Sequence, residues 1–512
     1  MSNCVVDECI AEGKYDGSCA LHCSKGDYQS DRHSGLLADF YDELFQYITN
    51  TDLSFLNPID KQDFSDYLSG KEFEFDNVKM TVEGTDLTIF NVHFPQRDGR
   101  DTYDYIELLK LFKGVHFDNC IFTVGLIDIT ETGGFYQDCV FNSVLNIKAN
   151  NLLENVNDVI YQGCTFKKNV ECNRFEGERY KLVIKHQQFN NCMFEGDFHC
   201  YGATFEKSIF FNTENFKQEI NKIKVEKCIF EGRFLLNETE ISFLSLVDCE
   251  VNGKVELKHN LVETVEIKNV NFKKLFDAYS SKFTTFKVQR SIYEDFTGFE
   301  KCEFGIKGDV VKGRVEFEYV TFLNFTNFRK AKFYNGLDFE HTNLKEPPNF
   351  LNAEVAPKNT NRETYRIIKH SFEKIGNQLE ANKYFSYEMK KYRQELQLKK
   401  VLSAERAVFW FNSKISNFGS TVSRPLLLMI TFAALYYLAV LGYESNLLYR
   451  IHEPANTFIN SFMTQANLFA KGIPPYGRFL KEGMEFVTLV FHIFFLISTW
   501  HFIIAVKRCT KR

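Results

Sequence analysis

The chain has 512 residues, more than one hydrophobic core normally serves, so we expect several structural units. Its 54 phenylalanines and only 9 prolines favour aromatic packing between strands over disorder. The net charge of −6 shows no excess of basic residues of the kind that binds nucleic acid, so we expect no nucleic acid among the partners of the protein.

The first 34 residues predict a small zinc-binding unit. The expected ligands are Cys4, Cys9, Cys19 and His22, with Cys23 as the alternative fourth ligand. Four thiolate and imidazole ligands close together, around turn-forming glycines, fit a tetrahedral Zn²⁺ of structural rather than catalytic type. The alternative is a cluster of free thiols on a mobile tail.

The redox state of the 14 cysteines follows from the start of the chain. The segment MSNCVVDECIAEG carries charges and no apolar run of signal-peptide length. We therefore expect a reducing compartment, with the cysteines present as thiols or metal ligands rather than disulfides.

Residues 35–114 predict an acidic region of mixed helix and strand. Its clearest element is an amphipathic helix over 35–49, where apolar residues recur at helical spacing. These are Leu36, Leu37, Phe40, Leu44 and Tyr47.

A degenerate hexamer recurs over residues 115–345 and predicts a β-solenoid. Its copies include FDNCIF (117–122), YQDCVF (136–141), YQGCTF (161–166), FNNCMF (189–194), FEKSIF (205–210), VEKCIF (225–230) and FEKCEF (299–304). The large residues lie five apart, which is neither the period of a strand nor that of a helix. A four-sided solenoid explains this spacing, with large residues pointing inward and small cysteines filling the corners. The alternative, a metal or redox array, is disfavoured because ligands cluster and these cysteines are spread along the chain.

At these hexamers the chain resembles the pentapeptide-repeat proteins, whose motif places a small residue two positions before a central Leu or Phe. The resemblance implies a right-handed β-helix with four pentapeptides in each turn. Positions 210, 230, 251 and 272 are separated by 20, 21 and 21 residues, close to one such turn each. Uneven gaps elsewhere predict insertions, and an antiparallel β-sandwich is the structural alternative. The N-terminal segment also looks like the Cys/His knuckles at the front of some members of this family.

Residues 346–424 predict a helical, basic juxtamembrane region. Apolar residues step by three and four and form a stripe made of Tyr365, Ile368, Phe372, Ile375 and Leu379. Gly376 and Asn377 interrupt this pattern and predict a turn into a second helix, giving a helical hairpin. Basic residues dominate from 383 to 424, as expected for a cytoplasmic segment near anionic lipid.

Residues 425–512 predict a membrane domain with two spans. The uncharged runs 425–443 and 486–506 approach or reach the length of about 20 residues that crossing a bilayer requires. Basic residues before the first run and after the second place both chain ends in the cytoplasm. The expected location is the bacterial inner membrane, and buried core helices are the alternative.

Three polar residues of the second span define one face of the predicted helix. Thr488, His492 and Thr499 could line a pore in a homo-oligomer, or they could form hydrogen bonds between helices of a passive anchor. The segment NFGSTVSRPLLLM resembles the ion-channel-like tail attached to some bacterial pentapeptide-repeat proteins. A short helix is also expected between the spans, but GIPPYG stands where a potassium filter would offer its carbonyl ladder.

No phosphate loop, dinucleotide fingerprint, HExxH or nucleophile elbow is present in the sequence, so we expect no enzyme. The favoured interpretation is a membrane-anchored scaffold or sensor whose solenoid binds a cytoplasmic protein. The alternative is an oligomeric ion channel or pore-forming effector that is gated by the solenoid.

Overall fold

The computed structural model divides the chain into two compact units, Met1–Asn359 and Thr360–Arg512. The residues it describes are 4–6, 9, 11–51, 86–96, 109, 112, 114–123, 134–147, 159–173, 182–211, 216–308, 313, 315–339, 341–398, 404–444, 457–471 and 480–510. Most of the predicted acidic region and the GIPPYG segment lie outside these residues.

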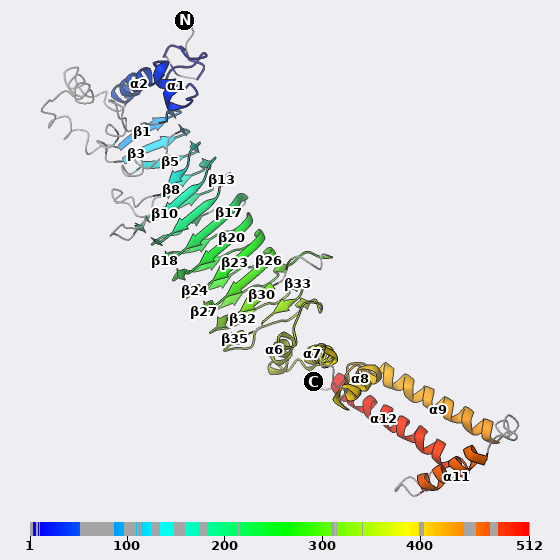
Figure 1. Ribbon diagram of the computed structural model, residues 1–512. Coiled ribbons are helices and arrows are strands. Elements are labelled where there is room, and N and C mark those ends of the chain that lie inside the picture. The colour runs from blue at the N-terminus through cyan, green and yellow to red at the C-terminus, as the bar shows by residue number, and fades with distance from the viewer. Residues whose placement is uncertain are drawn as a thin grey trace. The chain divides into compact units, whose positions relative to one another are not determined.

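The first unit is a β-solenoid of about 10 turns, in which short strands stack in parallel (Figure 1). One sheet contains β1 (Asp86–Phe90), β3 (Gly114–Asp118), β5 (Gly134–Gln137), β8 (Val159–Gln162), β12 (Gln187–Asn190) and β16 (Phe210–Phe211). A second contains β11 (Leu182–Ile184), β15 (Ala203–Phe205), β18 (Ile229–Phe230), β21 (Glu250–Val251), β24 (Asn271–Phe272), β27 (Ile292–Tyr293), β31 (Thr321–Phe322) and β35 (Asn343–Leu344). A third contains β19 (Phe234–Leu235), β22 (Val255–Glu256), β25 (Phe276–Asp277), β28 (Thr297–Gly298) and β32 (Thr326–Asn327).

The largest sheet contains the long strands of the central turns. Its members are β2 (His93–Phe94), β4 (Ile121–Phe122), β6 (Val140–Phe141), β7 (Leu145–Asn146), β9 (Thr165–Phe166), β10 (Val170–Asn173), β13 (Met193–Phe194), β14 (Phe198–Tyr201), β17 (Gln218–Glu226), β20 (Thr239–Val247), β23 (Leu261–Lys268), β26 (Lys282–Gln289), β29 (Glu303–Phe304), β30 (Val315–Glu318), β33 (Lys332–Phe333), β34 (Leu337–Asp338) and β36 (Glu354–Val355). Parallel pairing throughout these sheets excludes the antiparallel sandwich.

One turn illustrates how the sequence spacing becomes structure. The chain runs through β20, β21 and β22 and then enters β23 directly above β20, so that Ile241 pairs with Val262. Val251 pairs likewise with Phe272, which confirms the spacing of 21 residues read from the sequence. Among the described residues the stack runs from Asp86 to Val355, so it extends past residues 115–345 at both ends.

The two large residues of each hexamer form separate aromatic columns inside the first turns. Phe117 stacks on Tyr136 with ring centroids 5.0 Å apart, and Phe122 stacks on Phe141 at the same distance. Rings of the two columns meet edge to face, as Phe117 and Phe122 do at 5.2 Å. Each ring therefore makes both favourable aromatic geometries, and the columns account for the high phenylalanine content.

The small residue of the hexamer follows a corner with left-handed backbone. Asn119 and Asp138 have φ values of 52° and 51°, and the cysteine after each is fully buried. The Cys139 thiol donates to the carbonyls of Phe117 (3.5 Å) and Gln137 (3.2 Å). These contacts and the burial of the cysteines are those of space-filling corner residues.

The second unit is helical. It contains α6 (Arg362–Lys374), α7 (Gln378–Leu398), α8 (Ala404–Ser416), α9 (Ser423–Glu444), α11 (Thr457–Lys471) and α12 (Glu485–Thr510). The α6–α7 hairpin is present as predicted, with Gly376 at φ 77° in the turn. The predicted apolar stripe is buried only in part, because Ile375 and Leu379 at the turn are 66% and 63% exposed.

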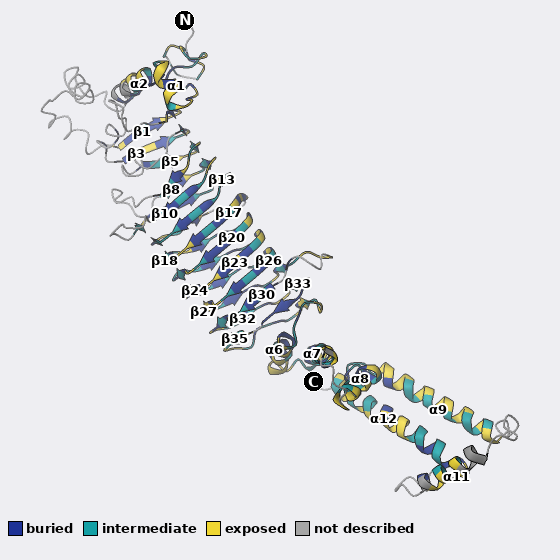
Figure 2. Cartoon of the chain, in the orientation of Figure 1, coloured by how far each residue is buried: buried dark blue, intermediate teal, exposed yellow. Residues whose placement is uncertain are grey.

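Helices α9 and α12 are long and apolar enough to cross a membrane, judged by length and composition. They pack on each other through Phe432 and Phe494, whose rings stack at 5.3 Å. Within the most apolar window, α9 has no buried residue and α12 has 17% of its residues buried. Figure 2 shows this contrast with the buried interior of the solenoid strands. Exposed side chains such as Leu427, Tyr437 and Trp500 form an apolar surface that water would solvate poorly.

Candidate metal centre and binding face

The structure brings the four predicted zinc ligands together. The Nδ1 atom of His22 lies 3.4 Å from the Sγ atom of Cys4 and 3.2 Å from that of Cys19. The sulfur of Cys9 lies 3.8 Å from the sulfur of Cys19. All four ligand atoms lie within 4.8 Å of one another.

These separations fit a tetrahedral Zn²⁺. Typical bonds from zinc to sulfur and imidazole nitrogen place neighbouring ligand atoms about 3.5 to 3.8 Å apart. Burial, together with the Lys25 ammonium, lowers the pKa of His22, which favours the neutral imidazole that binds metal. Burial also raises the pKa of the Cys19 thiol, so this thiol stays protonated unless a metal replaces its proton.

Cys23, the alternative fourth ligand, lies outside the cluster. Its thiol points to the carbonyl of Ala20 at 3.7 Å, and the residue is only 7% exposed. The group of four potential ligand atoms therefore contains His22 and leaves out Cys23, which is buried beside it.

The Cys/His cluster lies against the first described solenoid turn, and helix α2, which follows the cluster in sequence, packs on the same turn. The amide of His93 in β2 donates to the carbonyl of Leu21 at 2.9 Å. The short helix α1 (Tyr28–His33) leads to α2 (Leu36–Thr51), the helix predicted over 35–49. On α2, Phe40 packs edge to face on Phe94 at 6.0 Å. A ring of α2 thus covers the aromatic column at the first turn that the structure describes, and α2 forms a cap on this end of the solenoid.

Lys25 connects the cluster of Cys4, Cys9, Cys19 and His22 to helix α2. Its ammonium is buried and donates to the carbonyls of Ala20, Leu21 (3.2 Å) and Cys23 (3.1 Å). It also lies 4.9 Å from the ring centroid of Phe40. Burial lowers the pKa of Lys25 to about 8.

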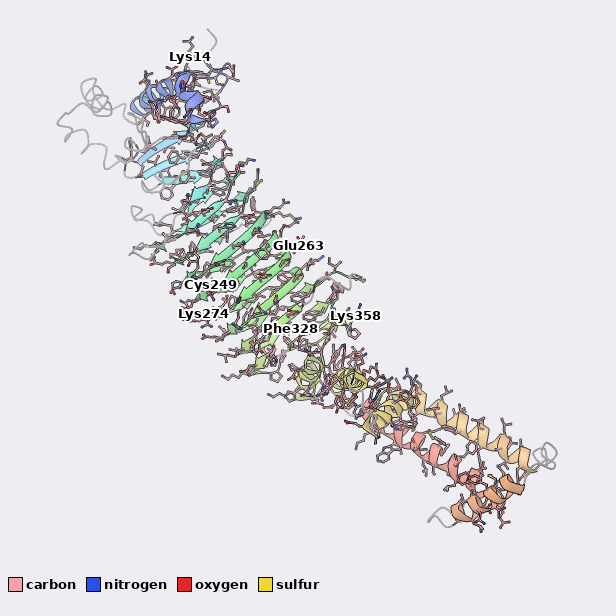
Figure 3. The ribbon with its side chains drawn as sticks, viewed as in Figure 1. Lys14, Cys249, Glu263, Lys274, Phe328 and Lys358 are labelled. Atoms are coloured by element: carbon pink, nitrogen blue, oxygen red, sulfur yellow. The ribbon has the colours of Figure 1, made fainter. Side chains whose placement is uncertain are left out.

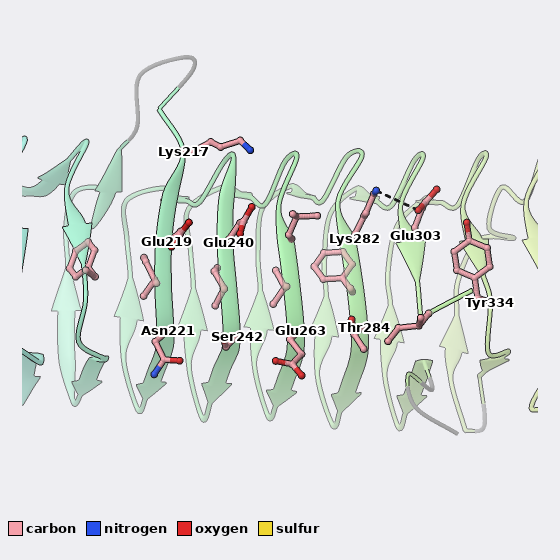
Figure 4. Close-up of a pocket in the computed structure, with 18 of the residues that line it drawn as sticks. Lys217, Glu219, Asn221, Glu240, Ser242, Glu263, Lys282, Thr284, Glu303 and Tyr334 are labelled. Carbon is pink, nitrogen blue, oxygen red and sulfur yellow. Dashed lines mark ion pairs between the residues drawn. The ribbon is translucent and has the colours of Figure 1, made fainter. Parts of the chain in front are cut away.

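A groove of about 1120 Å³ runs across the long strands in the middle of the solenoid. Figure 4 shows two rows of side chains along it. One row contains Lys217, Glu219, Glu240, Lys282 and Glu303, and the other contains Asn221, Ser242, Glu263 and Thr284. The rows arise because strands β17, β20, β23 and β26 pair in register, so equivalent residues recur every 21 positions.

The groove combines acidic groups with exposed apolar surface. Lys282 and Glu303 lie 3.9 Å apart, and Glu303 also pairs with Lys332 at 2.9 Å. Glu219, Glu240 and Glu263 make no ion pair within the residues that the structure describes. The apolar residues here are Met193, Leu261 and Ile306, which are 50%, 44% and 42% exposed.

The side chain of Glu263, labelled in Figure 3, is one of the outward-pointing carboxylates of this face. Sequence reasoning did not find the groove. The available signal was the recurrence of Glu219 and Glu240 one turn apart, which becomes visible only when the register of the turns is fixed.

The three residues predicted to line a pore have different surroundings within one chain. Thr488 is fully buried, and its hydroxyl lies 3.4 Å from that of Tyr436 on α9. The ring of His492 lies 6.2 Å from the same tyrosine ring. The Thr499 hydroxyl donates to the carbonyl of Phe495 in its own helix at 2.8 Å. The first two residues therefore face the partner helix of the hairpin.

No protein-family model matches the chain, and no curated protein and no solved structure matches it either. The likeness to pentapeptide-repeat proteins accordingly rests on the hexamers and on the stacked turns that they form.

Proposed function

We propose that the protein is a membrane-anchored scaffold whose solenoid groove binds a cytoplasmic protein through a basic segment of that partner. The observation that carries this proposal is the set of three groove carboxylates, on Glu219, Glu240 and Glu263, beside exposed apolar side chains. None of the three makes an ion pair within the part of the chain that the structure describes. Complementary charge would steer such a partner, and the apolar residues would supply contact area.

The location is proposed from the helices α9 and α12. Both chain ends would lie in the cytoplasm of a bacterium, with the hairpin crossing the inner membrane and the connecting α11 on the far side. The exposed apolar surface of both helices supports the crossing, because lipid chains would cover it. The cytoplasmic side of the chain ends is proposed from the basic residues that flank the two helices.

We assign a structural Zn²⁺ to Cys4, Cys9, Cys19 and His22. Bound zinc would cross-link the N-terminal segment in front of the first turn, and the folding energy of the cap would then depend on the metal. The solenoid itself would have the right-handed turn of the pentapeptide-repeat family.

The scaffold proposal is tested by photo-crosslinking of the full chain in cells. A photoreactive residue at Ser242 in the groove should capture a protein, whereas one at Lys268, further along the neighbouring strand, should not. Glu240→Lys together with Glu263→Lys should abolish the adduct by reversing the charge of the groove. Glu266→Lys on the same strand as Glu263 is the matched control. Equal adducts from both positions, or an adduct that survives the double reversal, would refute the proposal.

A channel is the second candidate, and the helix between the spans favours it. The side chain of Asn467 on α11 accepts from the amide of Phe486 at 2.8 Å and donates to the carbonyl of Gly483 at 3.0 Å. This fixes α11 against the start of α12, as a pore helix would require. In an oligomer, Thr488, His492 and Thr499 would then contribute to a pore.

The channel is tested with purified protein in liposomes. If the protein is a channel, the liposomes should conduct ions, and His492→Leu should remove the pH dependence of the flux. A monomer without ion flux would exclude it.

A further inference from the structure

A second, smaller cavity of about 350 Å³ lies within the helical unit. Its walls come from α7, from the turn at 417–420 that precedes α9, and from the last turn of α12. The three basic side chains that line it are Lys383, Lys390 and Arg508.

The positive charges around this cavity exceed the negative ones. Lys383 pairs with Glu380 at 3.1 Å. Lys390 and Arg508 have no carboxylate partner among the described residues, and neither does Arg424 at the start of α9. Burial, together with the charge of Arg424, lowers the pKa of Lys390. Unpaired cations this close together repel one another, and a bound anion would offset that repulsion.

Two of these cations are held in place by the fold. The Arg508 guanidinium donates to the carbonyl of Phe418 and lies 4.4 Å from the ring centroid of Phe385. The ammonium of Lys390 lies 5.3 Å from the ring of Tyr387. Both charges are therefore oriented before a ligand arrives, which lowers the entropic cost of binding.

The position of the cavity along the helices indicates where the ligand comes from. It lies where α9 begins and α12 ends, beyond the uncharged runs of both helices. On the adjoining helix α8, Trp410 and Phe411 are 46% and 51% exposed. Exposed tryptophan is typical of the depth of lipid headgroups.

We propose that this cavity binds the phosphate of an anionic phospholipid headgroup. The proposal rests on the membrane location given under the proposed function, since only a spanning hairpin brings the cavity to headgroup depth. The ligand chemistry is a phosphate ester among cations, and a free phosphate ion would share it.

The test uses the full chain in a neutral detergent and native mass spectrometry. The probes are dihexanoyl phosphatidylglycerol, dihexanoyl phosphatidylcholine and inorganic phosphate. We expect preferential binding of phosphatidylglycerol and a loss of about fivefold in its affinity for Lys390→Gln. Lys507→Gln, next to Arg508 but outside the cavity, is the matched control and should bind as the parent does. Arg508 is left intact because it holds the 417–420 turn.

Each result has a definite meaning. Equal binding of the two lipids, or no effect of Lys390→Gln, would overturn the site. Displacement of phosphatidylglycerol by inorganic phosphate at equal concentration would overturn the lipid assignment and leave a phosphate site. The location is tested separately by carbonate extraction of membranes. A chain released by carbonate would contradict the membrane location, whatever the detergent experiment shows.

Discussion

His93 illustrates how a single buried residue makes the stability of the N-terminal end of the solenoid depend on pH. It is only 7% exposed, and its Nε2 atom has no hydrogen-bond partner among the described residues. Burial, reinforced by the charge of Lys25, lowers the pKa of His93 to about 4 from 6.5. Between these two values the unfolded chain binds more protons than the folded chain. The contribution of His93 to stability is therefore complete above pH 6.5 and is lost as the pH falls towards 4.

We predict that lowering the pH from 7 to 5 destabilises the protein by about 1 to 2 kcal/mol through His93. The measurement is thermal unfolding of the full chain and of His93→Leu at both pH values. Zinc ligands are also protonated in this range, but they are common to both proteins, so the difference between the two profiles isolates His93. Parallel profiles would contradict the assignment.

The proposed zinc site gives a second prediction at this scale. Cys9→Ser should lose bound zinc and lower the melting temperature, because only three ligands would remain. Cys23→Ser should keep one zinc per chain, because its sulfur lies outside the ligand group. Zinc per chain, measured by elemental mass spectrometry, separates the two variants. Similar zinc loss in both variants would indicate that Cys23 is also a zinc ligand.

At the scale of the element, the corner of each turn determines which residues the repeat accepts. The left-handed corner recurs in successive turns at Asp248, Asn269, Arg290, Tyr319 and His341, with φ values from 50° to 57°. Asn, Asp and Gly adopt this conformation at low cost, whereas Arg and Tyr do not. The later turns therefore carry a strain that the earlier ones, with Asn119 or Gly163 at this position, avoid.

We predict that Arg290→Gly stabilises the solenoid by about 0.5 to 1 kcal/mol, because it removes the left-handed strain and keeps the amide bond to the Glu318 carbonyl. Thr285→Gly, in the extended strand β26, should destabilise by a comparable amount, since glycine there only adds unfolded-state entropy. Thermal unfolding of both variants provides the comparison. A destabilised Arg290→Gly would show that the arginine side chain outweighs the corner strain.

The repeat also shows which features of the structure could be predicted from the sequence. The spacing of five in FDNCIF was sufficient to predict stacked turns, inward aromatics and structural cysteines, because each feature repeats locally. The groove was not predictable in this way, since Glu240 and Glu263 belong to it only through the pairing of different turns. The clustering of Cys4, Cys9, Cys19 and His22 was predictable because these residues are close in sequence. Rejecting Cys23 required the direction of its side chain.

At the scale of the whole molecule, the cytoplasmic binding proposal depends on which side of the membrane each end occupies. Both termini and the groove must lie on one side, and the segment between α9 and α12 must lie on the other. Cys509, near the end of α12, offers a direct probe because it is the one exposed cysteine among those in the described residues. The cysteines of the solenoid are buried and should react slowly.

We predict that a membrane-impermeant maleimide labels Cys509 only after cells are permeabilised. A cysteine placed between the spans by Lys481→Cys should be labelled in intact cells, which makes it the matched control for reagent access. Cys509→Ser should remove most of the labelling that follows permeabilisation, so that the signal is assigned to this residue. Labelling of Cys509 in intact cells, with Lys481→Cys protected, would invert the hairpin. The solenoid groove and the basic cavity would then face away from the cytoplasm, and a cytoplasmic partner could reach neither.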